Sequence, residues 1–376
     1  MSLAQLEKIF RYFQKTGWEI WGPVKQDGEP PTELSPYLAA HQPLLKSDFN
    51  RIEIKNVERF SELYLSNQPP FYPFKRFFIP ESEALFEYRG NSLKEKRNAE
   101  KIALFGVNIK DLKAINLYDL VFAKDPYYQN QRKNILIIGY ARTPDEKLYL
   151  TEENLENVLA HLPFDVFLAD TTPTQSPPFQ GGEKEGVNSQ KLKAISYKLF
   201  TGSIKGQRIL EDFGCGDYIN IQFRGAVSED KEDNKKTARL RDQIKFRHNR
   251  KIWDDLGARC IECGKCAIAC PTCFCFRIDD RAELGHSHAQ RGNQALGYGT
   301  RTRCWDSCYY QEFSETTGGG KFLKNTADRI NFWYYHKFVR IPDEFNIRGC
   351  VGCGRCAKVC PVGIDIKEVV EEIEES

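Results

Sequence analysis

Hydrophobic and polar residues alternate with two different periods along the first 225 residues of the chain. Residues 102–107, 134–140 and 164–169 form short apolar runs rich in β-branched or aromatic side chains, which predicts buried strands. Residues 111–121 and 152–162 instead carry apolar side chains at helical spacing. Because strands and helices follow one another in turn, residues 1–225 are predicted to form an α/β or α+β domain with a mostly parallel sheet.

Loop composition and charge mark the end of this region. Residues 171–186 are dense in Pro, Gly and Ser, which predicts a surface loop. Residues 228–256 are highly charged and compatible with a helix, so we expect a solvated helix that connects to a second domain. The sequence therefore predicts two domains, residues 1–225 and residues 226–376, which is a reasonable number for 376 residues.

The overall composition excludes several classes of partner. Lysine and arginine total 54 against 52 aspartates and glutamates, and the net charge of +2 provides no field for binding nucleic acid. No run approaches 18 consecutive apolar residues, so no membrane insertion is expected. The first residues lack the continuous apolar centre of a secretory signal, which favours a cytoplasmic protein.

The thirteen cysteines are concentrated in the second domain. Twelve of them follow residue 259, and Cys215 precedes them. Because the cytosol keeps thiols reduced, clustered cysteines in a cytoplasmic protein indicate metal binding rather than disulfides.

Two segments repeat one cysteine pattern, CIECGKCAIACP at 260–271 and CVGCGRCAKVCP at 350–361. Each reads C-x2-C-x2-C-x3-C-P, the run with which two-cluster bacterial ferredoxins hold 4Fe-4S clusters. Three cysteines on a tight turn can each reach a different iron, and Gly264 and Gly354 relieve crowding there. Residues 226–376 are therefore predicted to form a mostly α-helical, ferredoxin-type domain with two 4Fe-4S clusters and an insertion at about 272–349.

In ferredoxins with this run, the fourth cysteine of each run ligates the other cluster. We therefore predict crossed ligation between the two segments. The first cluster is assigned to four thiolates, those of Cys260, Cys263, Cys266 and Cys360. The second cluster is assigned to the remaining four, those of Cys350, Cys353, Cys356 and Cys270.

Other interpretations of these cysteines stay open. Four thiolates per site also suit zinc, although zinc ribbons use paired C-x2-C knuckles rather than eight cysteines in this pattern. The clusters could also be purely structural. Cys266, Cys270 and Cys273 match the spacing of radical enzymes that use S-adenosylmethionine, but Cys260 and Cys263 complete the ferredoxin run, so we interpret that match as accidental.

Four further cysteines lie in the insertion: Cys273, Cys275, Cys304 and Cys308. Together they could bind a further metal or cluster, through C-x-C and C-x3-C halves brought together in space. The alternative is that they are buried small hydrophobic residues beside the clusters. His286 and His288 are weaker candidates for ligands, because such a pair is more common in polar loops.

The chain resembles a known family through specific motifs. These are CIECGKCAIACPTCFCF, CVGCGRCAKVCP, and CWDSC, in which Trp305, Asp306 and Ser307 match a Trp-Asp-Ser-Cys element. Weaker matches are KRFFIPESEALFEY, LFGVNIKDLKAINLYDLVF and KNILIIGY. In these segments the sequence resembles the iron-sulfur beta subunit of soluble nickel-iron sulfhydrogenases and the related A subunit of anaerobic sulfite reductase.

This resemblance implies an electron-transfer subunit. Members of the family pass electrons between a flavoprotein reductase subunit that handles NAD(P)H and a catalytic redox subunit that acts on hydrogen or sulfite. The chain departs from the family at four positions where related chains often carry cysteines, Lys110, Arg142, Leu148 and Leu150. Since all four cysteines are missing together, we predict no cluster in residues 1–225.

Three hypotheses for the function follow. The first is a non-catalytic relay subunit of a hydrogenase-type or sulfite reductase complex. The second is an oxidoreductase with its own cofactor site in residues 1–225, where the sequence shows no G-x-G-x-x-G, no P-loop and no catalytic residue that we can name. The third is a scaffold protein with structural clusters.

Overall fold

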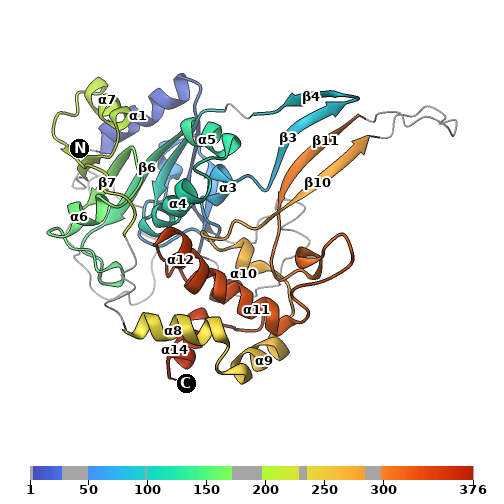
Figure 1. Cartoon of the computed structure of the whole chain (residues 1–376). Helices are drawn as coiled ribbons and strands as arrows, with labels where there is room; N and C mark the ends of the chain where they lie inside the picture. The colour runs from blue at the N-terminus through green and yellow to red at the C-terminus, as the bar shows by residue number, and fades with distance from the viewer. Residues whose placement is uncertain are drawn as a thin grey trace.

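The computed structural model describes residues 3–27, 50–97, 100–171, 197–227, 235–283 and 298–375. Almost all of the predicted loop at 171–186, together with His286 and His288, lies outside these ranges. Figure 1 shows a layered α/β region near the N-terminus, a helical region at the C-terminus and an arm of strands that projects from between them. No helix in the described ranges is long and apolar enough to cross a membrane.

A seven-stranded sheet organises the N-terminal region, with strand order β2-β1-β5-β6-β7-β8-β9. Its central strands β5, β6 and β7 are parallel, and β1 is parallel to β5. Strand β1 pairs antiparallel with β2, and β7 pairs antiparallel with β8. Strand β9 pairs parallel with β8. The strands are β1 (Glu19–Asp27), β2 (Asn50–Asn56), β5 (Ile102–Val107), β6 (Ile135–Arg142), β7 (Val166–Asp170), β8 (Tyr197–Thr201) and β9 (Ile219–Asn220).

Helices cover both faces of this sheet, so its central strands are buried on both sides. One apolar layer joins Leu104 and Ile137 to helices α4 and α5, and the opposite layer joins Phe105 and Leu136 to helix α1. Neighbouring residues alternate between the layers because side chains of a strand point to opposite faces. The helices of this region are α1 (Leu3–Lys15), α3 (Lys75–Phe78), α4 (Ile109–Val121), α5 (Pro126–Lys133), α6 (Leu155–Leu159) and α7 (Ile204–Asp212).

The prediction of a mixed α/β fold with a mostly parallel central sheet is confirmed. The predicted strands at 102–107, 134–140 and 164–169 correspond to β5, β6 and β7. Helix α4 begins two residues before the predicted segment, because the Asn108 side chain caps it by accepting a hydrogen bond from the Asp111 amide. Helix α6 is shorter than the predicted segment 152–162.

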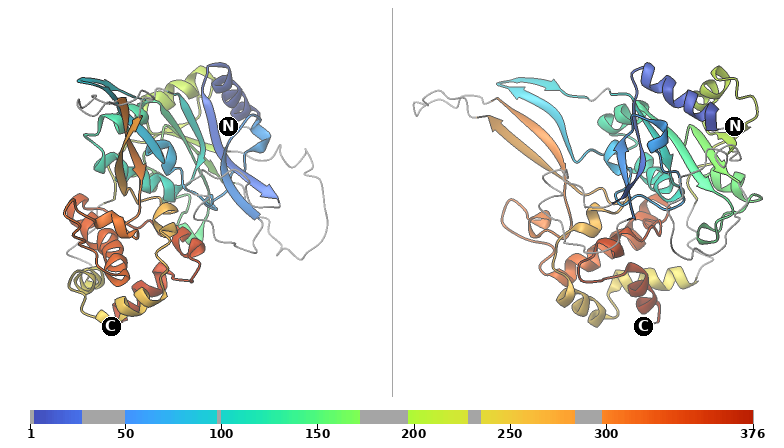
Figure 2. Two further views of the ribbon diagram at one scale, coloured as in Figure 1. Left: turned by 90° about the vertical axis from the view of Figure 1, so that its right-hand side faces the viewer. Right: turned by 180° about the vertical axis from the view of Figure 1, so that it is seen from behind.

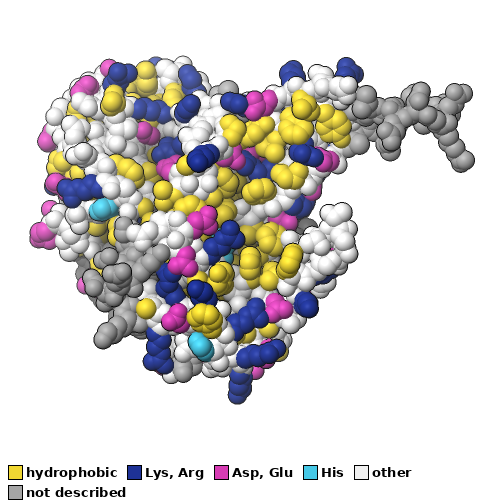
Figure 3. All heavy atoms as spheres, in the orientation of Figure 1, with side chains coloured by type: hydrophobic (Ala, Val, Ile, Leu, Met, Phe, Trp, Pro, Cys, Tyr) yellow, Lys and Arg dark blue, Asp and Glu magenta, His cyan; other side chains and the backbone are white. Residues whose placement is uncertain are grey.

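A second sheet has four antiparallel strands in the order β10-β11-β3-β4 and forms the projecting arm. Strands β3 (Ser82–Arg89) and β4 (Ser92–Glu95) come from the first predicted domain, whereas β10 (Phe276–Glu283) and β11 (Tyr298–Trp305) come from the insertion. The sheet therefore joins the two predicted domains, and the boundary near residue 225 stays a prediction. Large exposed apolar residues on these strands are Leu93, Phe276, Ile278 and Tyr298, and Figure 3 shows apolar side chains gathered along this sheet.

The C-terminal region, coloured yellow to red in Figure 2, adds a group of helices. The charged segment predicted as one connecting helix contains two, α8 and α9, with a break at Arg247, whose φ is 52°. Because β10 and β11 also belong to this region, the prediction that it is mostly helical holds only in part. The helices are α8 (Lys235–Phe246), α9 (Arg250–Arg259), α10 (Lys265–Ile268), α11 (Thr326–Tyr335), a π-helix (His336–Arg340), α12 (Ile341–Phe345), α13 (Arg355–Val359) and α14 (Ile366–Glu375).

A buried ion pair fastens the second cysteine run to the α/β region. The Arg355 guanidinium donates to both Asp111 carboxylate oxygens, at 2.7 and 2.8 Å, and Arg355 Nε donates to the Pro70 carbonyl at 2.8 Å. Both charged side chains are at most 3% exposed. Tyr118 Oη also donates to the Pro271 carbonyl. Helix α4 thus contacts both cysteine runs.

Substituting Asp111→Asn tests how strongly this pair stabilises the fold. Removing one partner leaves Arg355 as an uncompensated buried charge, which typically costs about 3–5 kcal/mol. For a chain of this size we expect the thermal midpoint to fall by about 4–6 °C, measured by circular dichroism. The matched control is Asp280→Asn, which breaks the exposed pair with Arg301 and should lower the thermal midpoint much less, because water screens that pair. Equal effects of the two substitutions would contradict the assignment.

Candidate metal centres

The two cysteine runs share one backbone conformation. Gly264 and Gly354, each directly after the second cysteine of its run, have φ values of 70° and 73° and precede the short helices α10 and α13. The residues before those second cysteines, Glu262 and Gly352, also have positive φ, 56° and 62°. These left-handed positions bend each run so that successive cysteines face the same space.

Glu262 adopts this conformation without being glycine. Its carboxylate accepts hydrogen bonds from Thr326 and from the buried Arg329, both on helix α11, and from Gln311 at 3.4 Å. Burial alone would raise the pKa of Glu262, but these hydrogen bonds and the Arg329 charge lower it below the usual value. The turn of the first run is therefore held on helix α11.

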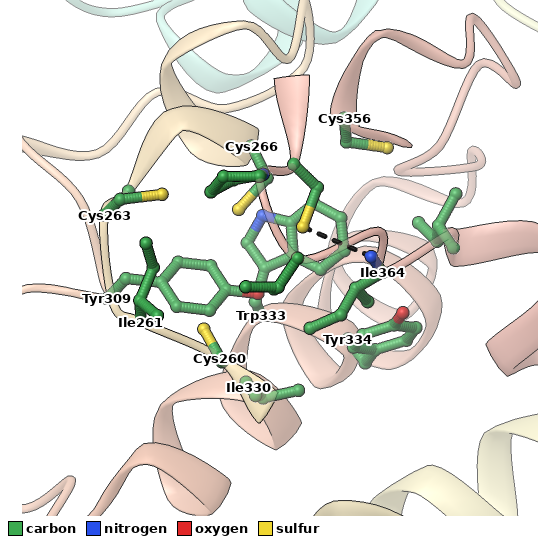
Figure 4. Close-up of a pocket in the computed structure, with 15 residues that line it drawn as sticks. Cys260, Ile261, Cys263, Cys266, Tyr309, Ile330, Trp333, Tyr334, Cys356 and Ile364 are labelled. Carbon is green, nitrogen blue, oxygen red and sulfur yellow. Dashed lines mark hydrogen bonds between the residues drawn. The ribbon is translucent and has the colours of Figure 1, made fainter. Parts of the chain in front are cut away.

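A pocket lies between the two runs (Figure 4). The sulfurs of Cys260, Cys263 and Cys266 point toward one another, whereas the Cys356 sulfur points away from them. Cys360 of the second run lines the same pocket. The other lining residues are apolar or small: Ile261, Gly264, Tyr309, Ile330, Trp333, Tyr334, Pro361, Val362, Ile364 and Ile366.

Backbone amides donate to sulfurs of this pocket, and two of its lining side chains carry buried donors. The Glu262 amide donates to Cys260 Sγ at 3.4 Å, and the Ile364 amide donates to Cys360 Sγ at 3.3 Å. Among the described residues, Trp333 Nε1 and Tyr334 Oη are buried without a hydrogen-bond partner. Since buried donors rarely stay unpaired, the pocket suits a group that brings acceptors such as sulfide. The donor set therefore fits an iron-sulfur cluster.

Cys270 lies in a separate, positively charged environment. Lys337 Nζ donates to Cys270 Sγ at 3.1 Å and to Thr272 Oγ1 at 3.0 Å. The neighbouring Cys273 thiol and the Lys337 charge lower the pKa of Cys270 well below that of an ordinary thiol. A lysine that donates to the sulfur favours the thiolate, the form that binds metals.

The first three cysteines of the second run belong to the surroundings of Cys270. Burial raises the pKa values of Cys350, Cys353 and Cys356, and a negative charge on Cys270 raises them further. Metal binding at this group would therefore release protons. Lys110 Nζ donates to the Gly352 carbonyl at 2.8 Å, which joins this run to the start of helix α4.

The four cysteines of the insertion separate into two groups. Cys273, Cys275 and Cys308 lie with Cys270 and Cys266 in one apolar cluster. Cys304 lies apart from them, with its sulfur 3.6 Å from Ser82 Oγ on strand β3.

Two buried lysines beside the cysteines were not predicted from the sequence. Lys75 and Lys337 are 5% and 2% exposed. Lys75 Nζ donates to the Ile268 carbonyl at 3.0 Å and lies 4.0 Å from the centre of the Trp305 ring. Burial lowers the pKa of Lys75, whereas for Lys337 the nearby sulfurs outweigh burial and raise the pKa well above its usual value. One feature of the sequence could have identified these two lysines as buried. Each lies within a run of aromatic residues, Lys75 in PFKRFF and Lys337 in YYHKFV.

The four N-terminal positions where relatives often carry cysteines have other roles here. Lys110 contacts the second cysteine run, as described above. Leu150 is buried in the apolar layer around α4, and Leu148 packs against it. Arg142 ends strand β6, and its amide donates to Asn67 Oδ1 at 2.7 Å. The absence of a cluster from residues 1–225 stays a prediction.

Comparisons with known proteins agree with the geometry. Residues 259–364 match the 4Fe-4S dicluster domain family. The chain is 29% identical to sulfhydrogenase 2 subunit beta of Pyrococcus furiosus, over 369 residues that cover 90% of this chain and 98% of the relative. No solved structure matches the chain. The resemblance to hydrogenase iron-sulfur subunits is therefore confirmed, and it supports an electron-transfer role with iron-sulfur clusters.

Alanine at Gly264 and at Gly354 provides a matched pair of tests for the shared turn. Each substitution forces a side chain into the left-handed region at a cost of about 1–2 kcal/mol. At Gly264 the added Cβ would also lie 2.8 Å from the Tyr310 ring, whereas at Gly354 nothing lies within 4 Å. We therefore expect Gly264→Ala to lower the thermal midpoint more than Gly354→Ala. Adding Tyr310→Ala should remove the difference, and equal midpoints in the two single variants would contradict this account.

Proposed function

We propose that this chain, whose residues 259–364 match the 4Fe-4S dicluster domain, is an electron-transfer subunit that holds two 4Fe-4S clusters by crossed ligation. One observation carries the proposal: Cys360 lines the pocket of the first run, about a hundred residues away in sequence. The first cluster takes the thiolates of Cys260, Cys263, Cys266 and Cys360. The second takes those of Cys350, Cys353, Cys356 and Cys270.

The sequence pattern of the cysteines supports clusters over zinc. Zinc ribbons use paired C-x2-C knuckles, whereas this chain carries C-x2-C-x2-C-x3-C-P twice. An iron-sulfur cluster takes each thiolate on a different iron and exchanges single electrons at a potential set by hydrogen bonds, charge and solvent exposure.

The protein would control these three factors through residues of known position. Amides of Glu262 and Ile364 donate to sulfurs of the first centre, while Lys337 places a positive charge beside Cys270 in the second. Aromatic side chains, including Trp333 and Tyr309, exclude water from the pocket. Hydrogen bonds and positive charge near the sulfurs favour the reduced state, which carries more negative charge.

We further propose that the relay connects an NAD(P)H-linked flavoprotein reductase subunit with a catalytic redox subunit of the hydrogenase type. The relative in Pyrococcus furiosus is named as a subunit of a sulfhydrogenase. The exposed apolar residues of the four-stranded sheet suit burial against another subunit. An anaerobic sulfite reductase is the alternative complex, and no residue of this chain distinguishes the two.

Pairs of cysteine-to-alanine substitutions test the crossed ligation. If Cys266 and Cys360 hold the same cluster, Cys266→Ala, Cys360→Ala and the double variant should each lose about four irons per chain. The pair Cys356→Ala with Cys360→Ala should instead lose about eight, because each removes a ligand of a different cluster. Iron and acid-labile sulfide are measured after anaerobic purification. The reverse pattern, eight for the first pair and four for the second, would show that each run holds its own cluster.

The relay role is tested with the chain on its own and with its native partners. Purified alone, it should contain iron and sulfide but no flavin, and it should not reduce viologen dyes with NADH, NADPH or hydrogen. When the protein is purified from its source under conditions that keep subunits associated, a flavoprotein and a catalytic redox subunit should co-purify with it. Steady turnover by the isolated chain would sink the relay proposal in favour of an oxidoreductase with its own cofactor.

A further inference from the structure

One buried lysine joins the end of the first cysteine run to the start of the second. Lys337 Nζ donates to Cys270 Sγ at 3.1 Å and to Thr272 Oγ1 at 3.0 Å. The Thr272 hydroxyl in turn donates to the carbonyl of Gly349 at 2.7 Å, and Gly349 directly precedes Cys350. Lys337 and Thr272 are 2% and 1% exposed. This network therefore holds the Lys337 ammonium where the two runs meet.

The backbone around Lys337 is shaped to bring it there. Lys337 lies in the π-helical turn His336–Arg340, between helices α11 and α12. Such turns are rare and occur frequently at functional sites. Gly349 packs so closely on this turn that an added Cβ would lie 2.5 Å from the Lys337 carbonyl oxygen and 2.8 Å from its Cα. The approach of the second run to Lys337 thus depends on glycine at this position.

The charge of Lys337 is not balanced by a carboxylate among its contacts in the described part of the chain. Its hydrogen bonds go to a sulfur and a hydroxyl, and the Trp333 ring centre lies 5.0 Å from its ammonium. Arg355 of the second run is instead paired with both oxygens of Asp111. Lys337 is therefore the buried cation whose charge acts on the sulfur of Cys270.

The pocket of the first run is stabilised differently. Its sulfurs accept hydrogen bonds from the backbone amides of Glu262 and Ile364, which carry no net charge. The Glu262 carboxylate is balanced by Arg329. Lys265 of this run is partly exposed, so water and salt screen its charge. The two centres therefore differ in one respect, a buried lysine that donates to a sulfur of the second.

We propose that Lys337 gives the two clusters unequal reduction potentials, so that the second cluster is reduced before the first. Reduction adds one electron, makes or breaks no bond at Lys337, and leaves one more negative charge beside it. A buried cation at a ligand sulfur stabilises that charge more than neutral amides do, because the protein interior screens charges weakly. The inference rests on the proposed two-cluster relay. Within that relay, an electron from the reductase subunit would reside mainly on the second cluster.

Redox titration of the anaerobically purified full chain tests the order of the potentials without altering Lys337. Dithionite supplies the electrons, and electron paramagnetic resonance follows the reduced clusters. We expect two one-electron steps in the native chain. Cys360→Ala should keep the cluster with the higher potential, whereas Cys356→Ala should keep the one with the lower potential. Equal potentials in the two variants, or the opposite order, would overturn the proposal.

Lys337→Met tests the lysine itself, because it removes the charge and keeps the length of the side chain. The preference of the second cluster for its reduced state should fall by about tenfold or more, which is about 59 mV for one electron. The lower potential should change much less. Lys337→Arg keeps the charge and should restore most of the native potential. Lys110→Met is the matched control, because Lys110 donates to the Gly352 carbonyl of the same run but is partly exposed, so its effect should be smaller.

Iron content separates failure of this inference from failure of the two-cluster proposal. About eight irons per chain in Lys337→Met, with both potentials as in the native chain, would overturn the role of Lys337 and leave the two clusters intact. A native chain that holds only about four irons would instead contradict the two-cluster proposal. If Lys337→Met does not fold or does not hold iron, the two cysteine variants still decide the order of the potentials.

Discussion

The buried ion pair between Arg355 and Asp111 fixes the position of the second cysteine run, and much of the molecule is arranged around it. Arg355 lies between Gly354 and Cys356, so the pair acts within the run itself. Asp111 belongs to the first turn of helix α4, which begins where the buried parallel strand β5 ends. The second cysteine run is therefore held against the first turn of helix α4, next to the end of a fully buried strand.

The charge on the buried sulfurs is a second constraint on the structure around the cysteines. Sulfurs that carry negative charge in an apolar interior need nearby donors or cations, since an isolated buried charge is costly. The chain supplies backbone amides at Cys260 and Cys360 and a lysine at Cys270. The Lys337 ammonium in turn is stabilised by the nearby sulfurs, which raise its pKa despite burial. Lys337 and Cys270 therefore explain each other's burial.

The sequence predicted local features well and long-range ones poorly. Strand β5 and the glycine turns of both cysteine runs follow from residue type and spacing alone, and both are present. The pairing of β11 with β3 depends on contacts between distant segments, which leave no periodic signal. For the same reason, the spacing of Cys304 and Cys308 could not show that they have different surroundings. They are four residues apart, but Cys304 lies beside Ser82 and Cys308 lies near Cys275.

The four-stranded sheet has a consequence for biosynthesis. Strand β3 is complete by Arg89, but its partner β11 begins only at Tyr298. At about 5–20 residues per second, a ribosome needs roughly 10–40 s to make the intervening chain. During that time one edge of β3 offers unpaired backbone groups to any other strand, the usual origin of aggregation. The nascent chain therefore exposes this edge until strand β11 has been made, and a pocket that includes Cys360 can be completed only after nearly all of the polypeptide has emerged.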